Sequence, residues 1–189
     1  TPIYKWTTLL ALCAGFIALT ACKHNQNTED STPVPDGMVR LSIDSMHATI
    51  DVPDTTRKIW GIEAMSSGSI HVFVGKGFQL LINVSGESIA MKKSDINGDD
   101  INKPKQWIVN DSNDLLYSTQ KDTNAFANAK EEFHFYAIVK KGKASYYIED
   151  LQQGSDGTVY NFNKDQAQTM LTSAKSITPL PPKAKNPSW

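Results

Sequence analysis

Cysteine is nearly absent from this sequence, which contains only Cys13 and Cys22 in 189 residues. This excludes a scaffold held by several disulfides and a zinc site made of four thiolates. An excess of basic residues is also missing, because 19 Lys and Arg residues stand against 20 Asp and Glu residues. Binding to nucleic acid requires a basic surface that neutralises phosphates, so we expect no nucleic-acid partner.

Motifs that carry catalytic chemistry are lacking as well. The sequence has no G-x-S-x-G, no H-E-x-x-H, no phosphate loop and no dinucleotide fingerprint. Residues 66–69 offer serine hydroxyl groups, but no motif places a histidine that would activate one of them, so a flexible turn is the favoured interpretation. We therefore predict no cofactor and no catalytic residue, and we favour a protein that is not an enzyme.

One segment resembles a metal-binding loop. Residues 95–102 carry oxygen-bearing side chains at alternate positions, as calcium loops do. The EF-hand pattern is broken, because Asp100 stands where glycine is required and Gln106 stands where a bidentate glutamate should close the shell. A solvated polar turn is the favoured interpretation, and a calcium site is the alternative. The four histidines share no ligand spacing, so they predict no metal site.

The start of the chain is an apolar segment without charge, residues 7–21, which follows Lys5. It is shorter than the roughly 20 residues of a membrane-spanning helix and is typical of a secretory signal. It ends in Leu19-Thr-Ala-Cys22, which resembles the lipobox of bacterial lipoproteins. The resemblance implies a signal peptide over residues 1–21, acylation of Cys22, attachment to the lipid bilayer, and a location in the cell envelope, at the outer membrane. The alternative is a buried N-terminal helix.

Proline-containing polar segments flank the region that can fold. Residues 22–37 are polar with no apolar period, which predicts a flexible tether. Residues 178–189 are rich in proline and predict an extended tail, either frayed or a docking peptide. Residues 38–177 are long enough to bury a core without disulfides, so we predict a single domain over this range.

Short segments with alternating apolar and polar side chains predict an α+β fold, an antiparallel β-sheet built of hairpins. The expected strands are residues 39–43, 48–52, 59–64, 70–74, 78–82, 107–111, 115–119, 133–139 and 144–151. Apolar residues at helical spacing over Lys164–Ile177, with Asn163 as the cap, predict a C-terminal helix packed on one sheet face. A shorter helix is predicted over residues 88–95.

The length and position of each hairpin loop determine which side chains lie opposite each other on a face of the sheet. A three-residue loop over residues 75–77 sets Val72 opposite Leu80 and gives one wholly apolar face. A two-residue loop at Lys141 and Gly142 would set Phe135 opposite Ile148 on a core face.

The other face of that last hairpin supplies the candidate binding residues. The same loop would place Tyr136 across from Tyr147 and His134 across from Glu149, which would raise the pKa of the imidazole. If no other layer covers this face, the four side chains form an amphipathic patch that recognises a protein or sugar partner. The alternative is that a helix or another layer covers it.

Four segments carry a further resemblance. They read Phe78-Gln-Leu80, Leu115-Leu-Tyr117, His134-Phe-Tyr-Ala-Ile-Val-Lys140 and, over residues 167–177, AQTMLTSAKSI. This block is similar to small lipoproteins of Bacteroidetes-type bacteria, and the resemblance implies an envelope location and no particular activity. The expected function is that of a membrane-anchored envelope lipoprotein acting as a non-catalytic binding or accessory module, with an envelope protein or a glycan as its partner. The alternative is a small envelope hydrolase or a carbohydrate-active accessory protein.

Overall fold

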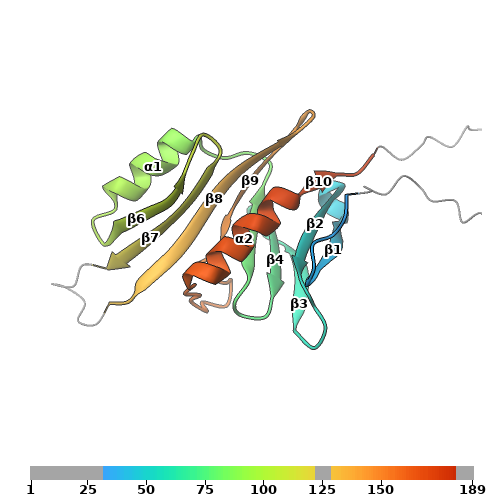
Figure 1. Ribbon diagram of the computed structural model, residues 1–189, viewed down its shortest axis with the longest axis horizontal. Helices are drawn as coiled ribbons and strands as arrows, with labels where there is room; N and C mark the ends of the chain where they lie inside the picture. Colours follow the sequence, from blue (N-terminus) through green and yellow to red (C-terminus); the bar gives the residue numbers. More distant parts are fainter. Residues whose placement is uncertain (1–31, 122–128, 182–189) are drawn as a thin grey trace, which may run out of the picture.

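The computed structural model describes residues 32–121 and 129–181 of the chain (Figure 1). The predicted signal peptide, Cys22, residues 23–31 of the predicted tether and residues 182–189 of the predicted tail lie outside the described residues. The predicted fold class is confirmed, since ten strands form two antiparallel sheets and two helices pack against them.

The larger sheet has seven strands in the order β3-β4-β5-β9-β8-β7-β6. In chain order these strands are β3 (Trp60–Ala64), β4 (Ile70–Val74), β5 (Gln79–Asn83), β6 (Asn102–Asn110), β7 (Asp114–Lys121), β8 (Glu131–Lys141) and β9 (Ala144–Asp150). The smaller sheet has the order β1-β2-β10 and consists of β1 (Met38–Ile43), β2 (Ala48–Pro53) and β10 (Thr178–Pro179). A single 3-10 turn, Asp44–Met46, connects β1 to β2.

Strand β10 corrects the predicted start of the C-terminal tail. Thr178 pairs with Thr49 of β2 and Pro179 pairs with Ala48, and the Leu180 amide donates to the His47 carbonyl at 2.6 Å. Proline is tolerated because β10 is an edge strand, where a missing N–H breaks no ladder. The domain therefore extends past residue 177.

Helix α2 (Lys164–Ser176) begins where the sequence predicts and ends one residue before the predicted end, with Ile177 as its C-cap. Asn163 accepts a hydrogen bond from the Gln166 amide, and the Gln166 side chain accepts one from the Asn163 amide, which is a complete capping box. Its buried face packs mainly on β8 and β2. The helix lies across one face of the larger sheet (Figure 1), which we call the front face.

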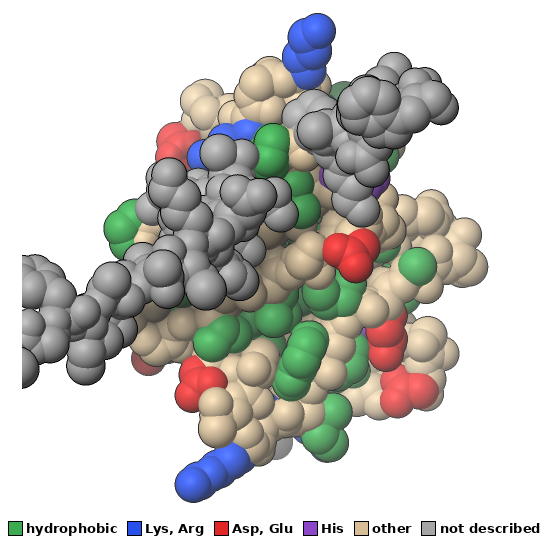
Figure 2. All heavy atoms as spheres, turned by 90° about the vertical axis from the view of Figure 1, so that its right-hand side faces the viewer, with side chains coloured by type: hydrophobic (Ala, Val, Ile, Leu, Met, Phe, Trp, Pro, Cys, Tyr) green, Lys and Arg blue, Asp and Glu red, His purple; other side chains and the backbone are tan. Residues whose placement is uncertain are grey.

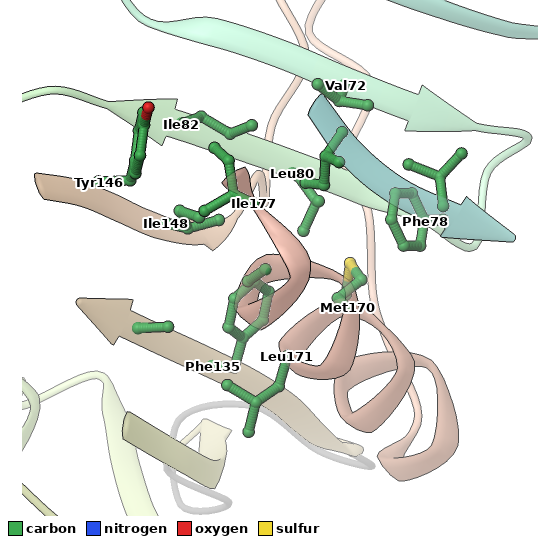
Figure 3. Packing of buried hydrophobic residues seen from close by; sticks show 14 of the residues in the cluster. Val72, Phe78, Leu80, Ile82, Phe135, Tyr146, Ile148, Met170, Leu171 and Ile177 are labelled. Carbon is green, nitrogen blue, oxygen red and sulfur yellow. The ribbon is translucent and has the colours of Figure 1, made fainter. Parts of the chain in front are cut away.

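The main core lies between this front face, α2 and the smaller sheet. Met170 and Leu171 of α2 point toward Phe135 of β8 and Leu80 of β5 (Figure 3), and all four are at most 1% exposed. The inner side of β2 joins the same cluster through Ala48, Ile50 and Val52. Two sheets and one helix therefore share one apolar interior.

Of the hairpins β4–β5, β6–β7 and β8–β9, the first has the predicted pairing. Val72 pairs with Leu80 and Ile70 with Ile82, as the three-residue loop requires. Strands β6 and β7 turn around residues 111–113, where the Asp111 amide donates to the Asp114 carbonyl.

The predicted pairing of the third hairpin is wrong by one step. The loop residues are Gly142 and Lys143, so Ala137 pairs with Ile148 and Tyr136 pairs with Glu149. Gly142 has a φ of +61° at the first loop position, which is the position where a type II′ turn requires glycine. Because the loop lies one residue further along the chain than predicted, the partner of each residue changes by two positions. Side chains alternate along a strand, so each one stays on its predicted face.

The back face of the larger sheet is covered over about half of its width by α1 (Ile89–Gly98), the helix predicted over residues 88–95. The Ser88 side chain caps it by accepting from the Met91 amide at 3.3 Å. Ile89 and Ile96 pack against Tyr117 and Tyr136 in a second, smaller core. Both faces of β7 and β8 are thereby buried.

The interior position of Leu171 gives a test of the main core. Leu171→Ala is expected to lower the free energy of unfolding by about 2–5 kcal/mol, because it deletes buried methyl groups and leaves a cavity. The exposed Thr172 on the same helix is the matched control, and Thr172→Ala is expected to change stability by less than about 0.5 kcal/mol. Urea unfolding followed by circular dichroism measures both, and equal losses would show that this face of α2 is not in the core.

Candidate functional site

The four predicted binding residues share the back face, but they do not form an exposed patch. His134 and Tyr136 are each 3% exposed, and Tyr147 and Glu149 are partly buried. Helix α1 lies over this part of the sheet and packs against Tyr136 and Tyr147. The expectation of an open patch is therefore wrong, and the alternative of a covering layer is confirmed.

The predicted pair of His134 and Glu149 is also wrong, because Glu149 has another partner. Lys92 of α1 donates to the Glu149 carboxylate at 2.6 Å, and its ammonium lies 5.1 Å from the centre of the Tyr136 ring. The Tyr136 hydroxyl donates to the Glu87 carbonyl at 2.8 Å. Burial, together with the charges of Glu149 and Glu87, raises the pKa of Tyr136 to about 12. These contacts fasten α1 to the sheet.

The partner of His134 is Asp150, at the end of β9. Asp150 Oδ2 lies 2.8 Å from His134 Nδ1, and Asp150 Oδ1 accepts a hydrogen bond from the Phe135 amide at 2.9 Å. Nε2 of the imidazole lies 3.1 Å from Thr119 Oγ1. Burial alone would lower the pKa of His134, but the hydrogen bond and charge of Asp150 outweigh it and raise the pKa above 6.5. The predicted direction is confirmed, with a different carboxylate as its cause.

The order Asp150–His134–Thr119 matches the hydrogen bonding of a catalytic triad, but its surroundings are unsuited to acyl transfer. A cavity of about 70 Å³ adjoins it, and the carboxylates of Asp99 and Glu132 line that cavity. Negative charge develops on the substrate oxygen during acyl transfer, and two carboxylates beside it would oppose that charge. We interpret this group as a buried ion pair that stabilises the fold.

The predicted calcium segment is divided between two elements. Asp95 and Asn97 lie within α1, while the Asp99 carboxylate accepts hydrogen bonds from the Ile101 and Asn102 amides, each at 2.8 Å. Hydrogen bonds from Asn102 and Ile101 lower the pKa of Asp99. Within residues 32–121 and 129–181, no cluster of three histidine, cysteine or acidic side chains is arranged to hold a metal ion.

The half of the back face that α1 leaves uncovered contains an open cavity of about 560 Å³. Strands β3, β4 and β5 form one side of it, and residues 154–160 form the other. We call this the back-face cavity. It is lined by Ile59, Glu63, His71, Phe73, Gly75, Lys76, Gln79, Gly154, Ser155, Asp156, Thr158 and Tyr160.

Two buried polar side chains, His71 and Gln79, lie in the cavity wall, where they are 7% and 2% exposed. The Gln79 amide nitrogen donates to the Gly75 carbonyl at 2.5 Å, so Gln79 Oε1 faces His71 Nε2 at 2.8 Å. Because Oε1 only accepts, Nε2 must carry the proton. In the neutral ring, Nδ1 is then left as an acceptor on the side of Glu63, whose carboxylate is 3.8 Å away.

Aromatic and acidic side chains complete the lining. The Phe73 ring contacts His71 with 5.1 Å between ring centres, and it lies across Gly61, where a Cβ atom would come within 2.7 Å of the ring. Glycine at that position lets the ring lie flat on β3. Tyr160 and Asp156 face them from the loop, and hydrogen bonds from the Thr158 amide and hydroxyl lower the pKa of Asp156.

The sequence marks His71 only as one of four histidines without ligand spacing, and it does not single out Gln79 or Asp150. A signal for the first two was present, because the alternation that puts Val72 and Leu80 in the core puts His71, Phe73 and Gln79 together on the other face. No local signal marks Asp150, since its contact with His134 depends on how β9 ends.

Comparison with known proteins gives no match, whether to family models, to curated proteins or to solved structures. Neither helix in the described part of the chain is long and apolar enough to cross a membrane.

The ion pair of His134 and Asp150 predicts a pH-dependent stability. A raised pKa in the folded state means that the stabilisation is fully present below the unfolded value of about 6.5 and is lost as the pH rises through the folded value. Asp150→Asn removes the charge while burial remains, so the pKa of His134 should fall below 6.5. The loss of stability should reach about 3 kcal/mol under acidic conditions and shrink under alkaline conditions.

Nuclear magnetic resonance titration of His134 and urea unfolding at about pH 5 and about pH 8 measure the two effects. Glu149→Gln is the control, because Glu149 contacts Lys92 and should leave the pKa of His134 nearly unchanged. A wild-type pKa in Asp150→Asn, or a shift that appears only in Glu149→Gln, would contradict this assignment.

Proposed function

We propose that this chain is a lipid-anchored protein of the bacterial cell envelope whose domain binds a saccharide in the back-face cavity. The proposal combines the lipobox-like sequence ending at Cys22 with the cavity on β3, β4 and β5. The main observation that supports a binding site is the buried pair of His71 and Gln79 in the wall of an open cavity that is also lined by aromatic rings. A cavity with a few convergent polar groups among apolar side chains is the usual form of a small-molecule site.

The chemistry of the lining favours a saccharide. Sugars present C–H faces that pack on aromatic rings and hydroxyl groups that both donate and accept hydrogen bonds. Phe73 and Tyr160 supply rings, Nδ1 of His71 and the carboxylates of Glu63 and Asp156 accept from hydroxyl groups, and Lys76 donates. Acidic and basic groups are both present, so a neutral ligand fits the lining better than one with a strong charge.

The hydrogen bonds of His71 favour binding over catalysis. Its Nε2–H donates to Gln79 Oε1. The Gln79 amide nitrogen in turn donates to the Gly75 carbonyl, which belongs to a backbone turn. A general base in a triad has a carboxylate hydrogen-bonded to its ring, which stabilises the charged imidazolium. Gln79 orients the ring without supplying charge, and the Glu63 carboxylate, 3.8 Å from Nδ1, lies beyond hydrogen-bond distance.

The anchor is tested by replacing the acylated residue. Cys22→Ser is expected to leave an unprocessed precursor without acyl label and to abolish the detergent-phase partitioning that lipidation confers, because the acyl chains provide the membrane affinity. Metabolic labelling with a fatty acid and gel mobility measure this, and Cys13→Ser serves as the matched control. Unchanged labelling of Cys22→Ser would refute the anchor.

The cavity is tested with defined sugars. We expect maltotriose or chitotriose to shift the His71 and Tyr160 resonances, and we expect Phe73→Leu to weaken that binding at least about tenfold, because the stacking surface is lost. Phe133→Leu is the control, since Phe133 is also partly buried but packs against the front core. Titration calorimetry of the full-length protein measures both variants.

The two halves of the proposal fail separately. Absence of shifts with both sugars, or equal weakening by both leucine variants, would refute the saccharide site and leave the anchor untouched. Unchanged acyl labelling of Cys22→Ser together with intact sugar binding would refute the anchor and leave the saccharide site standing.

A further inference from the structure

The two edges of the seven-stranded sheet are built differently. Strand β6 carries Lys103, Pro104 and Lys105, and its pairing with β7 is interrupted by two register shifts. Charges, proline and bulges are the devices by which edge strands avoid pairing with another chain. Strand β3, at the other edge, has the sequence WGIEA, with no lysine, no proline and a regular register to β4.

The phase of the β3–β4 ladder shows which backbone groups face outward. The Gly75 amide donates to the Ile59 carbonyl at 2.7 Å, and the Met65 amide donates to the Ser69 carbonyl at 2.8 Å. The odd-numbered residues of β3 therefore bond to β4, and the alternation of an antiparallel ladder directs the N–H and C=O groups of Trp60, Ile62 and Ala64 away from it. In the part of the chain that the structure describes, no strand pairs with this edge.

The sequence of β3 is complementary to itself about Ile62. If two copies pair antiparallel with Ile62 opposite Ile62, Trp60 stands opposite Ala64 and Gly61 stands opposite Glu63. Each large side chain then meets a small one, and the two glutamates do not face each other. The central pair uses outward-facing groups on both copies, so it can exchange two hydrogen bonds.

We propose that β3 is an isologous interface, at which two copies of this chain join their seven-stranded sheets edge to edge about a twofold axis through the Ile62 pair. Exposed apolar surface at this edge supports a second copy as the partner, because Ile59 is 82% exposed and Trp60 is 47% exposed. On the side of the molecule that carries β1 and β3, hydrophobic side chains lie at the surface among acidic ones (Figure 2). A second copy brings the same strand and an identical apolar edge, as twofold symmetry requires.

The inference is independent of the saccharide site. The side chains of Glu63 and His71 point to the back face, whereas pairing uses the backbone of the even-numbered residues. The cavity of each copy would stay open beside the joined edges. Pairs of five-residue strands are short, so the dimer is expected to be weak in dilute solution and favoured where a membrane anchor concentrates the chains.

Cysteine cross-linking tests the register. In a concentrated solution of the full-length protein with Cys13→Ser and Cys22→Ser, Ile62→Cys is expected to form a disulfide-linked dimer on mild oxidation, because opposed residues in this pairing lie about 5.5 Å apart between Cα atoms. Trp60→Cys and Ala64→Cys should each give little dimer alone, since like positions are about 13 Å apart along the strands. A mixture of these two variants should give the cross-linked heterodimer. Val159→Cys, at an exposed site outside β3, is the control for random collision.

A second variant tests the backbone bonds without a thiol. Ala64→Pro removes an N–H that makes no hydrogen bond to β4, so the monomer should keep its fold while cross-linking through Ile62→Cys falls at least about fivefold. Circular dichroism reports the fold. Equal cross-linking of Ile62→Cys, Trp60→Cys and Val159→Cys, or dimer formation unaffected by Ala64→Pro in a folded protein, would overturn the interface.

Discussion

The larger sheet has to bury apolar side chains on both of its faces, and the rest of the architecture depends on how that is done. Strands β7 and β8 are buried on both sides, so two separate layers are required. Helix α2 and the smaller sheet cover the front, and α1 covers the back. Because α1 has only ten residues, about 15 Å of helix, it cannot extend across all seven strands. The uncovered half of the back face becomes the cavity.

The buried ion pair of His134 and Asp150 contributes to the fold in a different way from the apolar cores beside it. Removing both a carboxylate and an imidazolium from water costs free energy that their attraction only partly offsets, so such pairs contribute less to stability than an apolar contact of the same size. Asp150 also accepts from the Phe135 amide, and His134 contacts the Tyr117 ring. The pair therefore fixes how the first part of β8 lies against the end of β9. Strand pairing alone leaves that relation loosely defined, because a register slip of two residues preserves the faces.

Periodicity in the sequence predicts which residues share a face better than it predicts which residues are partners. The alternation over β4 and β5 and the helical spacing of α2 are local patterns, and both are confirmed. The third hairpin shows the limit, because the position of Gly142 within its turn decides the pairing and one step changes every partner. The sequence leaves open whether a layer covers His134 and Tyr136, since that depends on where α1 packs in three dimensions. The cavity combines the β4–β5 hairpin with residues 154–160, and no local pattern brings those two segments together.

The smaller sheet joins the two ends of the domain, because β2 lies between β1 and β10. Helix α2 strengthens this junction, as the Ser176 hydroxyl accepts from the Asp51 amide and the Ser173 hydroxyl donates to the Asp51 carbonyl. These contacts join residues 125 and 122 positions apart in the chain, so they cannot form until nearly the whole domain has been synthesised. A chain that emerges N-terminus first must therefore keep the apolar side of β2 exposed until its last helix has arrived. An export pathway would have to hold such a chain unfolded or shield β2 until translocation is nearly complete.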